Sequence, residues 1–284
     1  MVESRLTRVL LRLGAAGTLV FIYFPLVVIA IYAFNANISQ TWPIDSYTTK
    51  WFGVAWHDEN VRSALALSLK AALGATAIAL VLGTLAAIAV SRHHFFGRET
   101  ISFLVILPIA LPGIITGLAL QATILNVLAP LGISFSIWTI IIGHATFCIV
   151  VVYNNAVARA RRIGGSLQEA SMDLGADTWQ TFRYVTFPQL RSALLAAALL
   201  AFALSFDEVV VTIFTSGAQE TLPIWIFTNF ARPRELPVVN VVALFVIVAS
   251  IIPVWIAQRV AGGSGLTSDR PTGGAVAASV EAAP

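Results

Sequence analysis

Charged side chains are scarce in this sequence of 284 residues. Asp, Glu, Lys and Arg make up only 11% of it, whereas 58% of the residues are hydrophobic and the mean hydropathy is +0.85. A soluble globular domain has about 25% charged residues, so the composition excludes that class. Several apolar runs reach the roughly 20 residues that a helix needs to cross a bilayer. The chain is therefore predicted to be a polytopic protein of the lipid bilayer.

Cysteine is also nearly absent, because the sequence holds one, Cys148, inside an apolar run. One thiol builds neither a disulfide nor a thiolate metal site within a chain. The sequence has no Walker A glycine-lysine motif and no recognisable hydrolytic constellation. We therefore expect no cofactor and no enzyme activity in this chain. Its arginines lie in short loops between apolar runs, which indicates membrane topology and not nucleic-acid binding.

Six apolar segments are predicted to be transmembrane helices, since each is long enough to span and none alternates like a barrel strand. They are residues 12–34, 64–90, 101–128, 133–157, 191–216 and 238–259. No cleavage signal follows the first segment, so it is read as a retained helix. The predicted organisation is a cytoplasmic N-terminus (1–11), a six-helix transmembrane domain (12–260) and a disordered cytoplasmic tail (261–284) of low complexity.

The distribution of basic residues predicts the orientation. Most of the 17 lysines and arginines lie in the N-terminus, the 91–100 loop, the 158–190 loop and the C-terminal side. The positive-inside rule then puts both termini in the cytoplasm.

The third segment contains "LPIALPGIITGLAL", with Pro108, Pro112 and a GxxxG pair, Gly113 and Gly117. These residues predict a kinked helix that packs closely on a neighbour. A broken helix that lines a transport path is the alternative.

The longest cytoplasmic loop, residues 158–190, is predicted to form two short helices. Ser166 and Glu169 have the spacing of a capping box. Gly175 is expected to end the first helix, and Asp177 or Thr178 to open the second. Such an ordered polar loop predicts a docking surface for another protein.

Within it, "EASMDLGADTWQTFRYVTFP" resembles the EAA loop of ABC-importer permease subunits. The positions that match in register are Glu169, Ala170, Gly175 and Pro188. Ser171 replaces the second alanine, Val185 an isoleucine and Phe187 a leucine. The resemblance covers about residues 12–260 and implies a type I importer fold, with this loop coupled to an ATPase subunit.

The stretch "LSFDEVVVTIFTSGAQETLPIWIF" is similar to the fifth span and following loop of spermidine/putrescine permeases. This resemblance implies a multi-pass protein of the bacterial inner membrane that transports polyamines. It also implies three kinds of partner: a second, homologous but non-identical permease, an ATPase dimer that binds ATP and Mg²⁺, and an extracytoplasmic solute-binding protein. Import of another amine-bearing or opine-like solute is the alternative; a secondary carrier, a channel and a structural anchor are more distant ones.

Two adjacent carboxylates, Asp207 and Glu208, fall inside the fifth apolar segment. Ionisable groups in a span usually mark a solute path, and carboxylates suit a cationic solute. Alternatively they pair with Lys70, or lie hydrated near the outer surface, about 24 Å from the inner end of the helix.

On a continuous helix a polar stripe would contain Glu208 together with Ser205, Thr212, and Thr215 or Ser216. Periodicity thus favours Glu208 as the path-lining group, whereas the family resemblance favours Asp207 at least equally. His144 in the fourth span is expected to form interhelical hydrogen bonds.

Overall fold

The computed structural model describes residues 5–92 and 95–262, and within these ranges the chain is almost entirely helical. The helices are α1 (Arg5–Tyr32), α2 (Lys50–His57), α3 (Glu59–Arg92), α4 (Arg98–Ala110), α5 (Gly113–Thr123), α6 (Ile137–Ala160), α7 (Ser166–Asp173), α8 (Thr178–Thr181), α9 (Phe187–Phe206), α10 (Val210–Thr215), α11 (Leu222–Phe230) and α12 (Leu236–Gly262). Short helical turns η1 (Ile124–Leu128) and η2 (Ala129–Leu131) prolong α5, and η3 (Phe182–Thr186) joins α8 to α9. The predicted all-α class is confirmed, while the tail beyond residue 262 lies outside the described residues.

Among the described residues, five helical stretches are long and apolar enough to cross a bilayer. They are Arg5–Tyr32, Glu59–Arg92, Gly113–Leu131, Ile137–Ala160 and Thr178–Phe206. A shorter apolar stretch, Leu236–Ile252, lies in α12. All six predicted segments are therefore helical, although two of them are broken.

The centre of the molecule is the packing of α3, α6 and α9, whose contact surfaces are made of small residues. Buried in this cluster are Ala75, Ala79, Ala145, Cys148, Ala197 and Ala201. A Cβ atom at Gly83 of α3 would lie 2.9 Å from the Cβ of Val152 and 3.0 Å from the carbonyl oxygen of Ile149, both on α6. Lipid gives little hydrophobic drive for helix association, so this close approach of backbones supplies much of the stabilisation.

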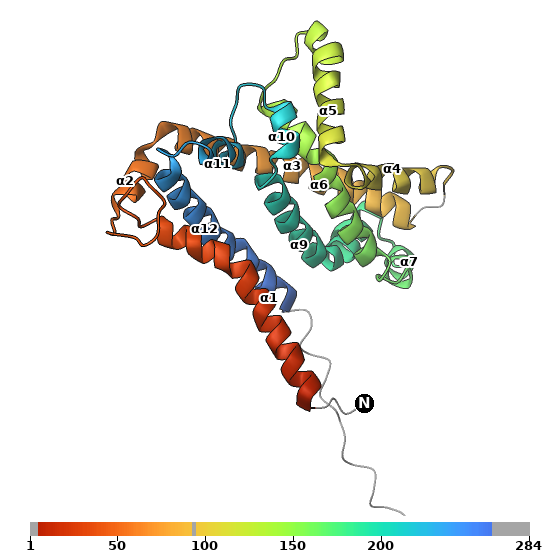
Figure 1. Ribbon diagram of the computed structural model, residues 1–284. Helices are drawn as coiled ribbons and strands as arrows, with labels where there is room; N and C mark the ends of the chain where they lie inside the picture. Colours follow the sequence, from red (N-terminus) through yellow and green to blue (C-terminus); the bar gives the residue numbers. More distant parts are fainter. Residues whose placement is uncertain (1–4, 93–94, 263–284) are drawn as a thin grey trace, which may run out of the picture.

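The remaining helices project from this centre. In Figure 1, α5 rises from one side of it, whereas α1 and α12 run together on the other side. The segment between α1 and α2 is held by polar bonds, since the Trp51 indole N–H donates to the carbonyl oxygen of Asn35 over 2.9 Å. At the start of α11, the backbone N–H of Leu222 donates to the Ser68 hydroxyl over 2.8 Å, which fixes α11 to α3.

The third predicted segment is a broken helix, which the sequence allowed as the alternative to a kink. Leu111 and Pro112 are extended (ψ 141° and 133°) between α4 and α5. Proline has no N–H and forces the residue before it out of the helical region, which explains the break. The predicted close packing of the GxxxG pair is confirmed, because Gly113 faces Val210 and Gly117 faces Phe214, both on α10.

The prediction of a continuous helix over 191–216 is wrong. Helix α9 ends at Phe206 and α10 begins at Val210, so the two carboxylates lie in the break. A side-chain oxygen of Glu208 accepts the backbone N–H of Val211 over 2.9 Å. This carboxylate therefore replaces a backbone carbonyl oxygen as the acceptor at the start of the new helix. Acidic side chains can compete in this way with the carbonyl oxygens of a regular helix.

Candidate functional site

The residues singled out in the sequence lie in or beside two regions: the loop between α6 and α9, called the coupling loop here (161–186), and the break between α9 and α10 (207–209). Pro188 follows the coupling loop in the first turn of α9, and Ser205 and Thr212 flank the break. In the coupling loop, α7 begins at Ser166 with Gly165 as its N-cap and without a side-chain cap. The predicted capping box of Ser166 and Glu169 is wrong, because Gly165 already has helical dihedral angles (φ −61°, ψ −31°). Ser166 is thus the first helical residue, one position too late to cap.

The predicted turn at Gly175 is confirmed. Its φ is +90°, and its N–H and that of Ala176 donate to the carbonyl oxygens of Met172 and Ser171 over 2.9 Å and 3.1 Å. This is a Schellman ending, which requires a left-handed residue and hence favours glycine. Asp177 then caps α8 as predicted, since its side chain and that of Gln180 exchange bonds with each other's backbone N–H.

One face of α7 is attached to the chain that follows it. The Ser171 and Thr181 hydroxyls lie 3.2 Å apart, and the Gln168 amide donates to the Thr186 hydroxyl over 2.6 Å. Glu169, Ala170 and Pro188 are exposed, and so are two large apolar side chains, Leu174 (90%) and Trp179 (64%). The two helices of the coupling loop are therefore bonded to each other, and the outward surface includes large apolar side chains.

Both ends of the coupling loop are tied to the helical centre by arginines. Arg92, in the last turn of α3, donates through one guanidinium nitrogen to the carbonyl oxygens of Ala160 and Ile163, each over 3.2 Å. Arg159, near the end of α6, donates to the carbonyl oxygen of Gln189 at the start of α9 over 2.9 Å. The loop thus leaves and re-enters the bundle at two fixed points.

At the break, the two carboxylates differ in surroundings. Asp207 is exposed and Glu208 is half-buried, with Glu208 engaged in capping α10. Within the described ranges neither forms a salt bridge, so the alternative pairing with Lys70 is not made there. The sequence left open which of the two faces the path; in the structure, Asp207 is the one whose side chain lines a cavity.

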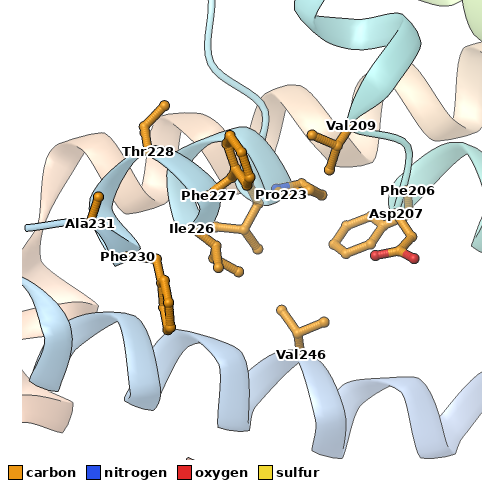
Figure 2. A pocket seen from close by; sticks show the side chains of 11 residues that line it. Phe206, Asp207, Val209, Pro223, Ile226, Phe227, Thr228, Phe230, Ala231 and Val246 are labelled. Carbon is orange, nitrogen blue, oxygen red and sulfur yellow. The ribbon is translucent and has the colours of Figure 1, made fainter. Parts of the chain in front are cut away.

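This cavity, of about 640 Å³, lies between the break, α11 and α12. Figure 2 shows Asp207 at one end of it and Phe230 at the other, with Val246 of α12 along one wall. The other lining residues are Phe206, Val209, Leu222, Pro223, Ile226, Phe227, Thr228 and Ala231. A single carboxylate on apolar and aromatic walls suits a cation with an apolar stem, because aromatic faces attract cations and a carboxylate accepts from ammonium groups.

The other members of the predicted polar stripe do not line this cavity. Ser205 and Thr212 are buried against α6, where their hydroxyls lie 2.8 Å and 2.7 Å from the two ring nitrogens of His144. The predicted interhelical bonding of His144 is thereby confirmed. The stripe is a helix–helix contact within this chain.

Sequence reasoning missed the aromatic wall made by Phe206, Phe227 and Phe230. The last two belong to α11, whose nine residues are too short to span, and the sequence places them in the loop that follows the fifth span. The signal was present in "LPIWIF", a proline-led apolar run of the kind that opens a helix.

Comparisons with known proteins agree with this architecture. Residues 79–262 match the family model of the binding-protein-dependent transport system inner membrane component. The putrescine transport system permease protein PotI of Escherichia coli is 33% identical over 80% of this chain and 82% of its own length. The spermidine/putrescine transport system permease protein PotC of Escherichia coli is 29% identical over 85% of this chain and 89% of its own.

A solved structure shares the fold. A chain of a bacterial ABC transporter involved in the import of the acidic polysaccharide alginate superposes with a TM-score of 0.67, at 20% identity, over 93% of this chain and 99% of that one.

Proposed function

Because the chain belongs to the family of inner-membrane components of binding-protein-dependent transport systems, we propose that it forms half of the path by which a polyamine enters a bacterial cell. The observation that carries the proposal is the similarity to two polyamine permeases over at least 80% of the chain. The proposed complex contains a second, homologous but non-identical permease, two ATPase subunits that bind ATP and Mg²⁺, and an extracytoplasmic solute-binding protein. Both termini and the coupling loop lie on the cytoplasmic side in this proposal.

The cavity beside Asp207 supports a cationic solute. A polyamine carries ammonium groups on a flexible apolar stem, and each ammonium needs an acceptor in place of the water it loses. Asp207 supplies a carboxylate acceptor, and Phe206, Phe227 and Phe230 supply aromatic and apolar contact for the stem. Glu208 adds a second negative charge next to it. Because one carboxylate, Asp207, is the only charged acceptor that lines the cavity in the described part of the chain, the solute is bound weakly and can be released.

The coupling loop supports the link to an ATPase. Glu169, Ala170, Ser171, Gly175 and Pro188 hold the positions of the family motif, and Gly175 makes the turn that joins α7 to α8. Leu174 and Trp179 are apolar side chains at the outward surface, and large aromatic and apolar groups are typical anchors in protein interfaces. We infer that ATP binding moves this surface and that the movement opens the path to the outside.

The test is putrescine uptake by the complete complex in proteoliposomes. Asp207→Asn is expected to lower uptake roughly tenfold, the factor for losing about one charge-assisted hydrogen bond, with basal ATP hydrolysis unchanged. Glu220→Gln is the matched control, because Glu220 is an exposed carboxylate outside the cavity lining. Equal uptake by the Asp207→Asn and parent complexes at equal abundance would contradict the cavity assignment. Preferred uptake of a different amine-bearing or opine-like compound would replace the polyamine as solute.

A further inference from the structure

His144 lies in α6, away from the cavity, yet it contacts both helices that flank the break. Its side chain is 1% exposed. Nδ1 lies 2.8 Å from the hydroxyl of Ser205, in the last turn of α9, and Nε2 lies 2.7 Å from the hydroxyl of Thr212, in α10. One imidazole therefore bridges the end of one helix and the body of the next.

The number of available protons gives these bonds a direction. The Thr212 hydroxyl donates its single proton to the backbone carbonyl oxygen of Glu208 over 2.6 Å, so it can only accept from the imidazole. Nε2 must then carry the N–H, which leaves Nδ1 as the acceptor for the Ser205 hydroxyl in a ring with one N–H. The bonds run from Ser205 to His144, from His144 to Thr212, and from Thr212 to Glu208, and bonds aligned in this way strengthen one another.

The same surface of α6 holds α10 at two further points. The Thr139 hydroxyl oxygen lies 2.8 Å from the carbonyl oxygen of Thr215 and 2.6 Å from that of Ser136, so its one proton is shared between the two acceptors. Gly143 lets α10 approach closely, because a Cβ atom there would lie 3.2 Å from a Thr215 methyl carbon and 3.3 Å from Val211. Helix α10 is thus positioned by α6, while the break itself has no continuous helical bonding.

We propose that His144 is a positioning residue for solute transfer: its bonds to Ser205 and Thr212 fix the backbone of the break and so hold the Asp207 carboxylate toward the cavity. The Thr212 hydroxyl that His144 contacts donates in turn to the Glu208 carbonyl oxygen, so the peptide unit between Glu208 and Val209, one residue beyond Asp207, is held as well. The solute in this inference rests on the proposed function, whereas the positioning itself is a property of the fold.

Three substitutions of His144 distinguish the effect of its bond to Ser205 from that of its bond to Thr212. His144→Leu removes both of them. The amide of Gln in His144→Gln extends about as far as Nε2 and can still donate to Thr212, whereas the shorter amide in His144→Asn reaches only the side of Ser205. Thr76→Val is the matched control, since Thr76 is a buried hydroxyl in the same helical centre whose Oγ1 has no hydrogen-bond partner within the described residues.

The first readout is the reactivity of a cysteine at the break. Cys148→Ala removes the single cysteine of the chain, and Asp207→Cys then reports the orientation of position 207 in the assembled complex. We expect His144→Leu and His144→Asn to change the rate of reaction with a charged, membrane-impermeant thiol reagent by about threefold to tenfold, the range for one to two hydrogen bonds between membrane helices. His144→Gln and Thr76→Val should stay near the parent rate. An unchanged rate in His144→Leu, at equal complex abundance, would overturn the proposal.

The second readout is putrescine uptake per ATP hydrolysed, measured with Asp207 present. A positioning defect lowers this ratio in His144→Leu and is partly rescued in His144→Gln, whereas an effect on complex abundance alone leaves the ratio unchanged and contradicts the positioning role. Protection by putrescine of an Ala231→Cys thiol, in a chain that keeps Asp207, tests the proposed function separately, because Ala231 also lines the cavity. Absence of that protection, with the His144 effect on the Asp207→Cys labelling rate intact, would refute the polyamine assignment and support the positioning role.

Discussion

Gly175 offers the sharpest test of the coupling loop, because its backbone conformation disfavours a side chain although the surrounding space would accommodate one. Its φ of +90° disfavours any residue with a Cβ atom, yet a Cβ atom built there meets nothing within 4 Å. Substitution at this position therefore changes backbone energy alone, without steric overlap with a neighbour. Gly164, in the same loop, has an ordinary φ and would bring a Cβ atom only to 3.4 Å from the Ser166 hydroxyl.

The expected magnitude follows from the backbone strain. An L-residue in the left-handed region costs about 1–2 kcal/mol, and a β-branched side chain lies at or above the upper end of this range. Since about 1.4 kcal/mol is a factor of ten in an equilibrium, Gly175→Val is expected to lower the population of the docked loop roughly tenfold or more. Gly175→Ala should give an intermediate loss. Gly175→Asn should stay near the parent, because asparagine tolerates the left-handed conformation.

The assay is ATP hydrolysis by the reconstituted complex, with and without the loaded binding protein, at equal abundance of all subunits. Stimulation by the binding protein is expected to fall in the order Gly, Asn, Ala, Val at position 175, while Gly164→Ala keeps the parent value. Full stimulation in Gly175→Val would refute the docking role of the turn. A defect in Gly175→Asn as large as that in Gly175→Val would show that the side chain, and not the backbone, is responsible.

Two further predictions concern topology and helix packing. A reporter fused after Asp269 should be active in the cytoplasm, and a cysteine placed in the 42–56 segment should react with an impermeant reagent added outside whole cells; reaction only from the inside would invert the orientation. Gly117→Ala should destabilise the purified complex by about 1–3 kcal/mol and lower its melting temperature, because the added methyl group overlaps the Phe214 ring. Gly113→Ala should leave the melting temperature unchanged, because its methyl group would lie at an ordinary 3.5 Å from Val210. Equal melting temperatures for the two variants would mean that α5 does not rest on α10.

The features that the sequence predicted correctly depend on local rules. A run of apolar residues is helical in lipid because the backbone must bond to itself, so all six segments were found. Gly175 and Asp177 end and begin helices through bonds to residues within five positions of themselves. Such short-range bonding can be recognised in a single sequence. The family motif depends on the same positions.

The features that the sequence did not predict depend on distant contacts. At the break, a local bond from the Val211 N–H to a Glu208 side-chain oxygen is accompanied by distant ones, because His144, more than 60 positions earlier in the chain, bonds the Ser205 and Thr212 hydroxyls on either side of the break. Hydropathy does not detect such contacts. Helix α11 is fixed by Ser68, more than 150 positions earlier in the chain. The cavity between them therefore has no counterpart in any single stretch of sequence, although one of its walls is a recognisable apolar run.

The two arginines at the ends of the coupling loop have a mechanical consequence. Arg92 of α3 bonds the chain where the loop begins, at Ala160 and Ile163. Arg159 of α6 bonds it where the loop ends, at Gln189. Hydrogen bonds therefore attach both ends of the coupling loop directly to the packed helices α3, α6 and α9. In the proposed complex, a displacement of α7 by the ATPase would therefore be transmitted through these bonds to α3, α6 and α9.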